Sequence, residues 1–194
     1  MESQWSDPLF KQLAIILLSF LGTLGLVLFP FRKKNTHMTA AWASFQSWLF
    51  FAPILFLMLA AGHPYPLLGI TFISLLCAKE FFQITGMYHK SIFVWATYLC
   101  NVAYAYCVHK DYLIAYETLP MLFLAILSII PILLNQAKNM LQFIALSLIC
   151  SMFVGWGFLH TAWIVKMPNG AFFLIYIILL TELSDNISLA VSRL

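Results

Sequence analysis

The feature that most constrains this chain is a series of long apolar segments separated by short polar breaks. Each segment approaches the roughly 20 helical residues that are needed to cross a hydrocarbon core about 30 Å thick. A backbone inside a membrane must satisfy its own hydrogen bonds, so segments of this length are predicted to be helices. The seven segments are Leu13–Phe29, Phe45–Ala61, Leu67–Met87, Ile92–Val108, Leu119–Leu134, Leu141–Val165 and Ala171–Ala190.

The composition agrees with a chain whose surface faces lipid. Only 9% of the residues are charged and 63% are hydrophobic, with a mean hydropathy of +0.93. A soluble domain carries about 25% charged residues, because water must solvate its surface. The sequence therefore predicts an all-α, polytopic integral membrane protein. The breaks are too short to hold a soluble domain, so residues 1–194 are predicted to form a single transmembrane helical domain.

Basic residues predict how the chain crosses the membrane. With the N-terminus outside, six Lys and Arg residues fall on the cytoplasmic side and three on the outer side. This asymmetry favours seven spans and a cytoplasmic C-terminus. The tight cluster Arg32-Lys33-Lys34 follows the first span, so it is predicted to set topology and not to bind nucleic acid. The compact loops favour a bacterial inner membrane.

Two carboxylates near the end of the last apolar segment are candidates for function. Ionisable groups are costly inside a membrane, by about 2.5 kcal/mol or more at its centre, and they often mark functional sites. Glu182 and Asp185 are three residues apart, which places them on one helical face, where they could share a cation. With oxygens from Thr181, Ser184 and Asn186 nearby, the set suits Mg²⁺. The alternative is a solvated helix end with Arg193 as a salt-bridge partner.

The third segment holds a second charged pair, Lys79-Glu80. Adjacent helical residues point about 100° apart, so these two are poor partners for each other. They either mark the cytoplasmic end of a helix or support Glu182 and Asp185 as a structural or catalytic partner. In the sixth segment, Gly155-Trp156-Gly157 is predicted to be a packing or kink site, and His160 a hydrogen-bonded packing residue.

The stretch TELSDNISLAVSRL, residues 181–194, resembles the opening of the signature region of the phosphatidate cytidylyltransferase family. In one branch of that family an apolar helix ends in Thr-Glu-Leu-x-Asp before a glycine-containing segment. Glu80-Phe81 resembles a weaker family feature. The resemblance implies a membrane nucleotidyltransferase that condenses CTP with phosphatidic acid, releasing pyrophosphate and forming CDP-diacylglycerol for phospholipid synthesis. It also implies that Asp185 binds the catalytic Mg²⁺ and that Glu182 is the glutamate of the same motif.

The resemblance also predicts what should follow these residues. The family's Ser-Pro-x-Lys-Thr-x-Glu-Gly stretch would come after Leu194, so the chain is predicted to be the N-terminal portion of such an enzyme and not to be active alone. Two alternatives stay open. Glu80, Glu182 and Asp185 could line the cation path of a transporter or ion-coupled carrier, or the chain could be a non-catalytic membrane subunit. The expected partners are CTP, phosphatidic acid and the bilayer, without nucleic acid, and a homo-oligomer is possible.

Overall fold

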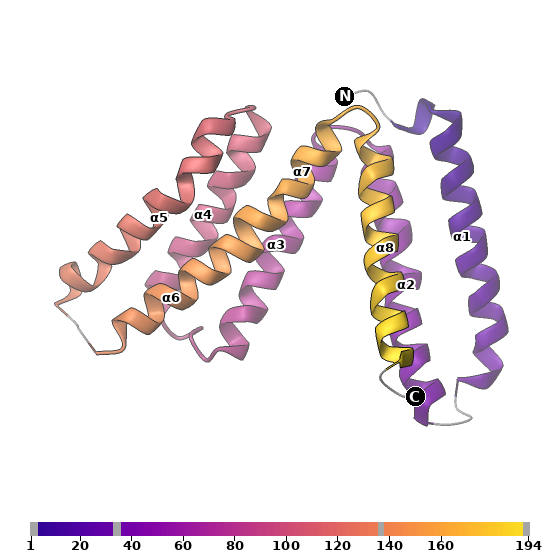
Figure 1. The fold of residues 1–194 in the computed structure, drawn as a ribbon, viewed down its shortest axis with the longest axis horizontal. Coiled ribbons are helices and arrows are strands. Elements are labelled where there is room, and N and C mark those ends of the chain that lie inside the picture. Colours follow the sequence, from indigo (N-terminus) through magenta and orange to yellow (C-terminus); the bar gives the residue numbers. More distant parts are fainter. Residues whose placement is uncertain (1–3, 33–35, 136–137, 192–194) are drawn as a thin grey trace. The chain divides into compact units, whose positions relative to one another are not determined.

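The described part of the chain is built from helices. The computed structural model describes residues 4–32, 36–135 and 138–191, and no strand occurs in these ranges (Figure 1). The predicted all-α fold is thus confirmed. The longer elements are α1 (Pro8–Leu28), α2 (Thr36–Ala60), α3 (Tyr65–Ile84), α4 (Ser91–His109), α5 (Leu113–Leu134), α6 (Met140–Cys150), the π-helical segment η3 (Ser151–Gly157), α7 (Phe158–Lys166) and α8 (Gly170–Val191).

Within the described ranges, five helices are long and apolar enough to cross a membrane. They are α1, α3, α4, α5 and the continuous helix Met140–Lys166, which α6, η3 and α7 form together. A shorter apolar stretch, Phe45–Ala60, lies in α2. The protein is therefore a multi-pass integral membrane protein, as its composition predicted. The count of seven spans and the outside position of the N-terminus stay predictions.

Three helices begin five or more residues earlier than their hydropathy predicted. One of them, α2, begins at Thr36, nine residues before the predicted Phe45. α1 begins at Pro8, because the Asp7 carboxylate accepts a hydrogen bond from the Leu9 backbone nitrogen at 2.9 Å and Pro8 suits the first helical position. α5 begins at Leu113, six residues before the predicted span. The predicted polar break before α5 was therefore too long, since hydropathy marks where a helix becomes lipophilic and not where its hydrogen bonding starts. As a result, Glu117 lies inside α5.

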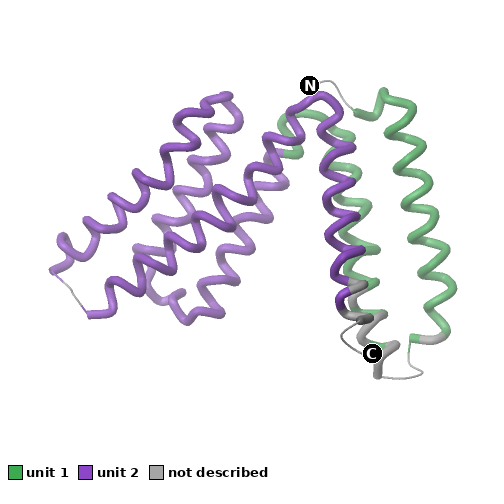
Figure 2. The backbone as a smooth tube through the Cα atoms, viewed as in Figure 1, with its two compact units in different colours: residues 1–66 green, residues 67–194 purple. Residues whose placement is uncertain are grey.

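The chain divides into two compact units, of which the first covers residues 1–66 (Figure 2). Unit 1 consists mainly of α1 and α2, which pack against each other. Phe10 of α1 is fully buried, and its ring meets that of Phe56 edge to face with centroids 6.0 Å apart. Most of the remaining surface of α1 consists of exposed apolar side chains, as expected of a helix that faces lipid.

Unit 2, residues 67–194, is organised around α4, which packs against α5, α6, η3 and α7. A chain of buried polar groups joins three of its helices. Asn101 of α4 donates through Nδ2 to the Ser74 hydroxyl of α3 at 3.1 Å, and that hydroxyl donates to the Val154 carbonyl of η3 at 2.7 Å. Within lipid, where apolar burial does little to drive association, such bonds and close packing hold helices together.

A glycine allows the π-helical segment to approach α4 closely. A Cβ at Gly155 would overlap the Asn101 side-chain oxygen and come within 3.1 Å of the Tyr104 ring. Any larger residue would therefore push η3 away from α4. This close approach agrees with the packing role predicted for Gly155-Trp156-Gly157. Single π-helical turns inside α-helices are frequent at functional sites, and η3 directly precedes the turn that carries His160.

Candidate functional site

The two carboxylates predicted to bind metal lie on α8, beyond the part of that helix that packs against α7. Ala171, Leu174 and Ile175 are buried. Farther along α8, Glu182 is half-buried and Asp185 is exposed. Buried apolar residues thus anchor the first half of α8, while the second half presents its carboxylates at the surface.

The helical geometry of α8 fixes the relation between the two acids, called the acid pair below. Three residues along an α-helix give a rise of about 4.5 Å and a rotation of about 300°, so both side chains leave neighbouring parts of one face. The Thr181 hydroxyl donates back to the Ile177 carbonyl at 2.9 Å and keeps its lone pairs for other partners. Ser184 is exposed. The side chain of Asn186 and the whole of Arg193 lie outside the described residues.

The second predicted pair, Lys79 and Glu80, lies on α3, four to five residues before that helix ends at Ile84. Both residues are exposed. In unit 2 the C-terminal ends of α3 and α8 lie toward the same end of the helices (Figure 1). The described residues contain no cluster of three or more His, Cys, Asp or Glu side chains able to hold a metal. Glu80 therefore does not join the acid pair in such a cluster, and its role as a supporting polar group stays a prediction.

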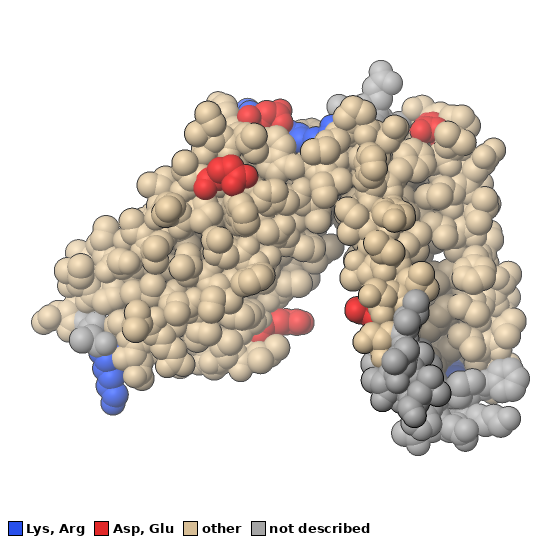
Figure 3. All heavy atoms as spheres, viewed as in Figure 1, with Lys and Arg blue, Asp and Glu red and all other residues tan. Residues whose placement is uncertain are grey.

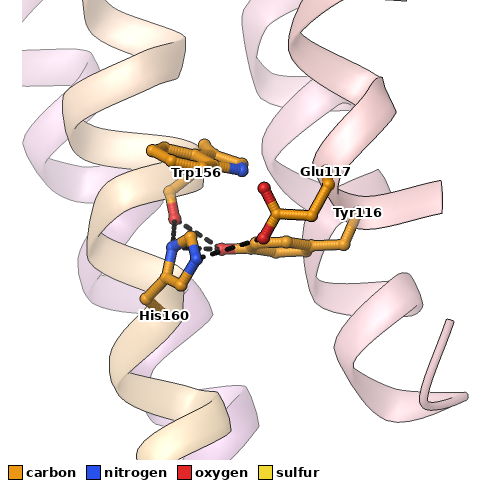
Figure 4. Close-up of polar contacts among 4 residues, drawn as sticks. All are labelled: Tyr116, Glu117, Trp156 and His160. Carbon is orange, nitrogen blue, oxygen red and sulfur yellow. Dashed lines mark hydrogen bonds and ion pairs between the residues drawn. The ribbon is translucent and has the colours of Figure 1, made fainter. Parts of the chain in front are cut away.

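Another polar group, which the sequence did not reveal as a unit, lies where α5 meets η3 and α7. It consists of Tyr116, Glu117, Trp156 and His160, and is called the His160 cluster below (Figure 4). The Tyr116 hydroxyl donates to the Trp156 carbonyl, and His160 Nδ1 lies 2.8 Å from the same oxygen. His160 Nε2 lies 3.5 Å from Glu117 Oε1. The prediction of a hydrogen-bonded packing role for His160 agrees with these contacts.

Close aromatic packing surrounds this cluster. The Tyr116 side chain is fully buried, and its ring meets the rings of Tyr104, His160 and Trp163 edge to face with centroids 5.0–6.0 Å apart. The Trp156 and His160 rings are closer still, with centroids 4.5 Å apart. Such edge-to-face pairs contribute about 0.5–1.5 kcal/mol each beyond the burial of their area. The backbone of α5 is therefore firmly positioned against α7 beside Glu117.

A second polar link joins the C-terminal end of α7 to α4 and to the turn between α4 and α5. Lys166, at the end of α7, donates to the Val108 carbonyl of α4 and to Asp111 Oδ1, both at 2.5 Å. Asp111 has a left-handed backbone conformation, with φ of 60°, in the turn between α4 and α5. On the face drawn in Figure 3 charged side chains are few, and broad areas of unit 2 carry none. Ionic groups are thus sparse on this face of the unit.

A comparison with known families identifies the class of protein that this arrangement belongs to. The chain matches the cytidylyltransferase family over residues 42–191, from within α2 to the end of α8. No curated protein and no solved structure matches it. A multi-pass helical membrane protein that matches this family belongs to the class of membrane nucleotidyltransferases. The chain belongs to the cytidylyltransferase family, the family of phosphatidate cytidylyltransferases. The resemblance predicted from residues 181–194 is thereby confirmed, while α1 lies outside the matched region.

Proposed function

We propose that the protein transfers the cytidylyl group of CTP to phosphatidic acid, which forms CDP-diacylglycerol and releases pyrophosphate. The observation that carries this proposal is the family match, which includes the whole of α8 up to Val191 and therefore both acids. Membership of the family supports a nucleotide and a lipid as substrates. The choice of CTP and phosphatidic acid within those classes rests on the likeness of residues 181–194 to the synthase signature. We place the enzyme in a bacterial inner membrane.

The position of the acid pair suits a reaction between a soluble and a lipid substrate. A phosphatidate oxygen attacks the α-phosphorus of CTP, the bond to the β-phosphate breaks, and pyrophosphate leaves. Both reactants are anions, so the site must offset their negative charge. The exposed Asp185 lies two turns of helix before the end of α8, and the predicted topology puts it near the cytoplasmic surface. There a headgroup and a nucleotide can meet.

The residues present fit a magnesium ion. Mg²⁺ prefers oxygen ligands, and it usually takes one or two carboxylates from the protein together with phosphate oxygens and water. The acid pair offers two carboxylates on one face of α8, and substrate phosphates and water would complete the coordination. When bound, the ion would offset charge on the reacting phosphates and on the leaving pyrophosphate.

Each residue then has a distinct role. Asp185, the more exposed acid, would hold the metal on the nucleotide side of the site. Glu182, half-buried one turn earlier, would support the same ion and fix its position on the helix face. Lys79 and Glu80 would act from α3, the lysine as a counter-charge to substrate phosphate and the glutamate as a supporting polar group.

The decisive experiment replaces one carboxylate oxygen with an amide. In membranes containing the full-length protein, we expect Asp185→Asn to lower incorporation of labelled CTP into lipid by at least about 100-fold, with unchanged protein abundance. Losing a group that only supports a metal ligand already costs about 10- to 100-fold. Asp111→Asn is the matched control, because it makes the same change in the turn between α4 and α5 and should retain activity. Near-normal incorporation by Asp185→Asn would refute the assignment of Asp185. A lack of lipid labelling by the unsubstituted protein would refute the proposed reaction.

A further inference from the structure

We propose that Glu117 and His160 form a binding site for a primary ammonium group, such as the one in the headgroup of an ethanolamine phospholipid. The site belongs to the His160 cluster and shares no residue with the acid pair. The proposal therefore goes beyond the cytidylyltransferase reaction and does not depend on it. Three observations lead to it: two hydrogen-bond acceptors face each other, the nearest lysine is already bound elsewhere, and the pair is exposed close to a membrane surface.

The first observation concerns the hydrogen on the His160 ring. The Trp156 carbonyl oxygen can only accept hydrogen bonds. The Tyr116 hydroxyl donates its one hydrogen to this oxygen, and His160 Nδ1 lies 2.8 Å from the same oxygen. Nδ1 must therefore carry a hydrogen and donate it. A neutral imidazole has a single N–H, so Nε2 is the acceptor of this ring.

This acceptor faces a second one. Nε2 lies 3.5 Å from Glu117 Oε1, and a carboxylate can only accept (Figure 4). Two acceptors at this distance repel each other unless a donor lies between them. An ammonium group supplies several N–H donors, and its charge offsets that of the carboxylate. The Glu117 side chain would move outward by about 1 Å to admit the nitrogen, because each hydrogen bond needs about 2.9 Å.

The nearest lysine does not supply this donor. Lys166, at the end of α7, donates to the Val108 carbonyl and to Asp111. Across the described ranges, no ion pair joins Glu117 to a lysine or arginine. A metal ion fits less well, because zinc takes three or four protein ligands and the described residues hold no group of three. The donor set therefore favours an organic cation.

The aromatic residue beside the two acceptors also favours a cation. The Trp156 indole lies next to them, and its ring centroid is 4.5 Å from that of His160 (Figure 4). Aromatic rings attract cations through the negative charge on their faces, and tryptophan does so best. A quaternary ammonium group would share this attraction, but it has no N–H for the two acceptors. The site should therefore select ammonium groups that keep their hydrogens.

The pair lies where a lipid headgroup can reach it. The side chains of His160 and Glu117 are 38% and 45% exposed, respectively. Glu117 lies four residues from the start of α5, or about 6 Å along the helix. His160 lies six residues from the end of the helix Met140–Lys166, whose 27 residues span about 40 Å. Since the hydrocarbon core is only about 30 Å thick, both acceptors lie near its boundary with the headgroups.

Competitive lipid binding to the purified full chain in detergent tests the proposal, with native mass spectrometry at one fixed pH as the readout. The competing lipids have identical acyl chains, and their ethanolamine headgroups carry no, one, two or three N-methyl groups. These headgroups keep three, two, one and no N–H donors. Two acceptors need two donors, so the first two lipids should bind alike. We expect binding to fall about 10-fold at the third, the scale of one hydrogen bond to a charged group.

Substitutions then assign this step in affinity to the two residues. Glu117→Gln removes the charge and one acceptor oxygen, so the step should disappear. His160→Phe keeps an aromatic ring and removes Nε2, so dimethyl and monomethyl headgroups should bind alike. Glu80→Gln is the matched control, because it makes the same change at an exposed carboxylate on α3 and should retain the step. The lipid series on the unsubstituted protein decides the question even if a variant fails to fold.

Soluble phosphoethanolamine distinguishes the sources of the ammonium group. If it displaces the ethanolamine lipid from the unsubstituted protein but not from Glu80→Gln alone, the step belongs to another residue and the proposal fails. If it displaces the lipid from both proteins, the ammonium site is supported and also accepts a soluble ligand. If it displaces the lipid from neither, the site is supported as one for a membrane lipid. Binding that does not depend on N-methylation, or a step that persists in Glu117→Gln, would overturn the proposal.

Discussion

The His160 cluster and the acid pair use ionisable residues in opposite ways. In the His160 cluster, polar atoms from α5, η3 and α7 meet one another, and the Trp156 carbonyl alone receives two donors. In the acid pair, both carboxylates belong to one helix, and one of them is exposed. Polar groups that bond one helix to another stabilise one particular packing of those helices. Polar groups displayed on a single helix face leave coordination positions for a ligand.

This difference predicts that substitutions at the two places separate stability from activity. A change in the His160 cluster or its supporting contacts should lower the unfolding midpoint and leave the reaction intact in the folded fraction. A change in the acid pair should abolish or weaken the reaction and leave the midpoint intact. Each prediction below tests one side of this contrast, beginning with the largest expected effect.

The strongest test of the packing between helices is Gly155→Ala, which changes the contact of η3 with α4. The added methyl group would overlap Asn101 and force η3 away from α4, so we expect a loss of about 2–3 kcal/mol in the free energy of unfolding. The measurement is the unfolding midpoint of the purified protein. Gly22→Ala in α1 is the matched control, since nothing lies within 4 Å of the added Cβ and alanine favours a helix. Equal midpoints for the two variants would show that η3 is not closely packed.

The corresponding test of the acid pair is Glu182→Gln. Weakening one of two proposed metal ligands should lower CTP incorporation by about 10- to 100-fold, which corresponds to about 1.4–2.7 kcal/mol in the activation barrier. The unfolding midpoint should change less than in Gly155→Ala, because glutamine keeps the size of the half-buried Glu182 side chain. Glu117→Gln makes the same chemical change in the other region and should retain incorporation. If Glu182→Gln instead lowers the midpoint and spares activity, the two regions have been assigned the wrong roles.

The smallest expected effect comes from Lys166→Met, which keeps the aliphatic stem and removes the ammonium group. The variant loses donors to the Val108 carbonyl and Asp111. We expect a loss of about 1 kcal/mol in the free energy of unfolding, because Asp111 is 68% exposed and that half of the interaction is screened. Lys110→Met, an exposed neighbour in the same turn, should change the midpoint much less. A similar shift in both variants would mean that general surface charge, and not this link, sets the stability.

Much of the fold could be predicted from the sequence because membranes leave few choices. Apolar length and scarce charge predicted the helices, and the last predicted segment, Ala171–Ala190, differs from α8 by one residue at each end. Helix starts were less predictable. The beginning of α1 depends on a cap from Asp7, and that of α5 on backbone bonding through polar residues. Neither the Asp7 cap nor these polar residues raise the local hydropathy, so a search for apolar segments does not detect where these helices begin.

The sequence by itself determined the membrane class, the family signature and the one-face geometry of Glu182 and Asp185, because helical periodicity relates residues three apart without reference to any other helix. Only the tertiary structure decided that Tyr116 meets His160, since these residues are 44 positions apart. Their contact depends on how α5 packs against η3 and α7, where the Tyr116 hydroxyl also donates to the Trp156 carbonyl. A lone histidine in an apolar segment carries no sign of the carboxylate that faces it. That relation exists only once the helices pack.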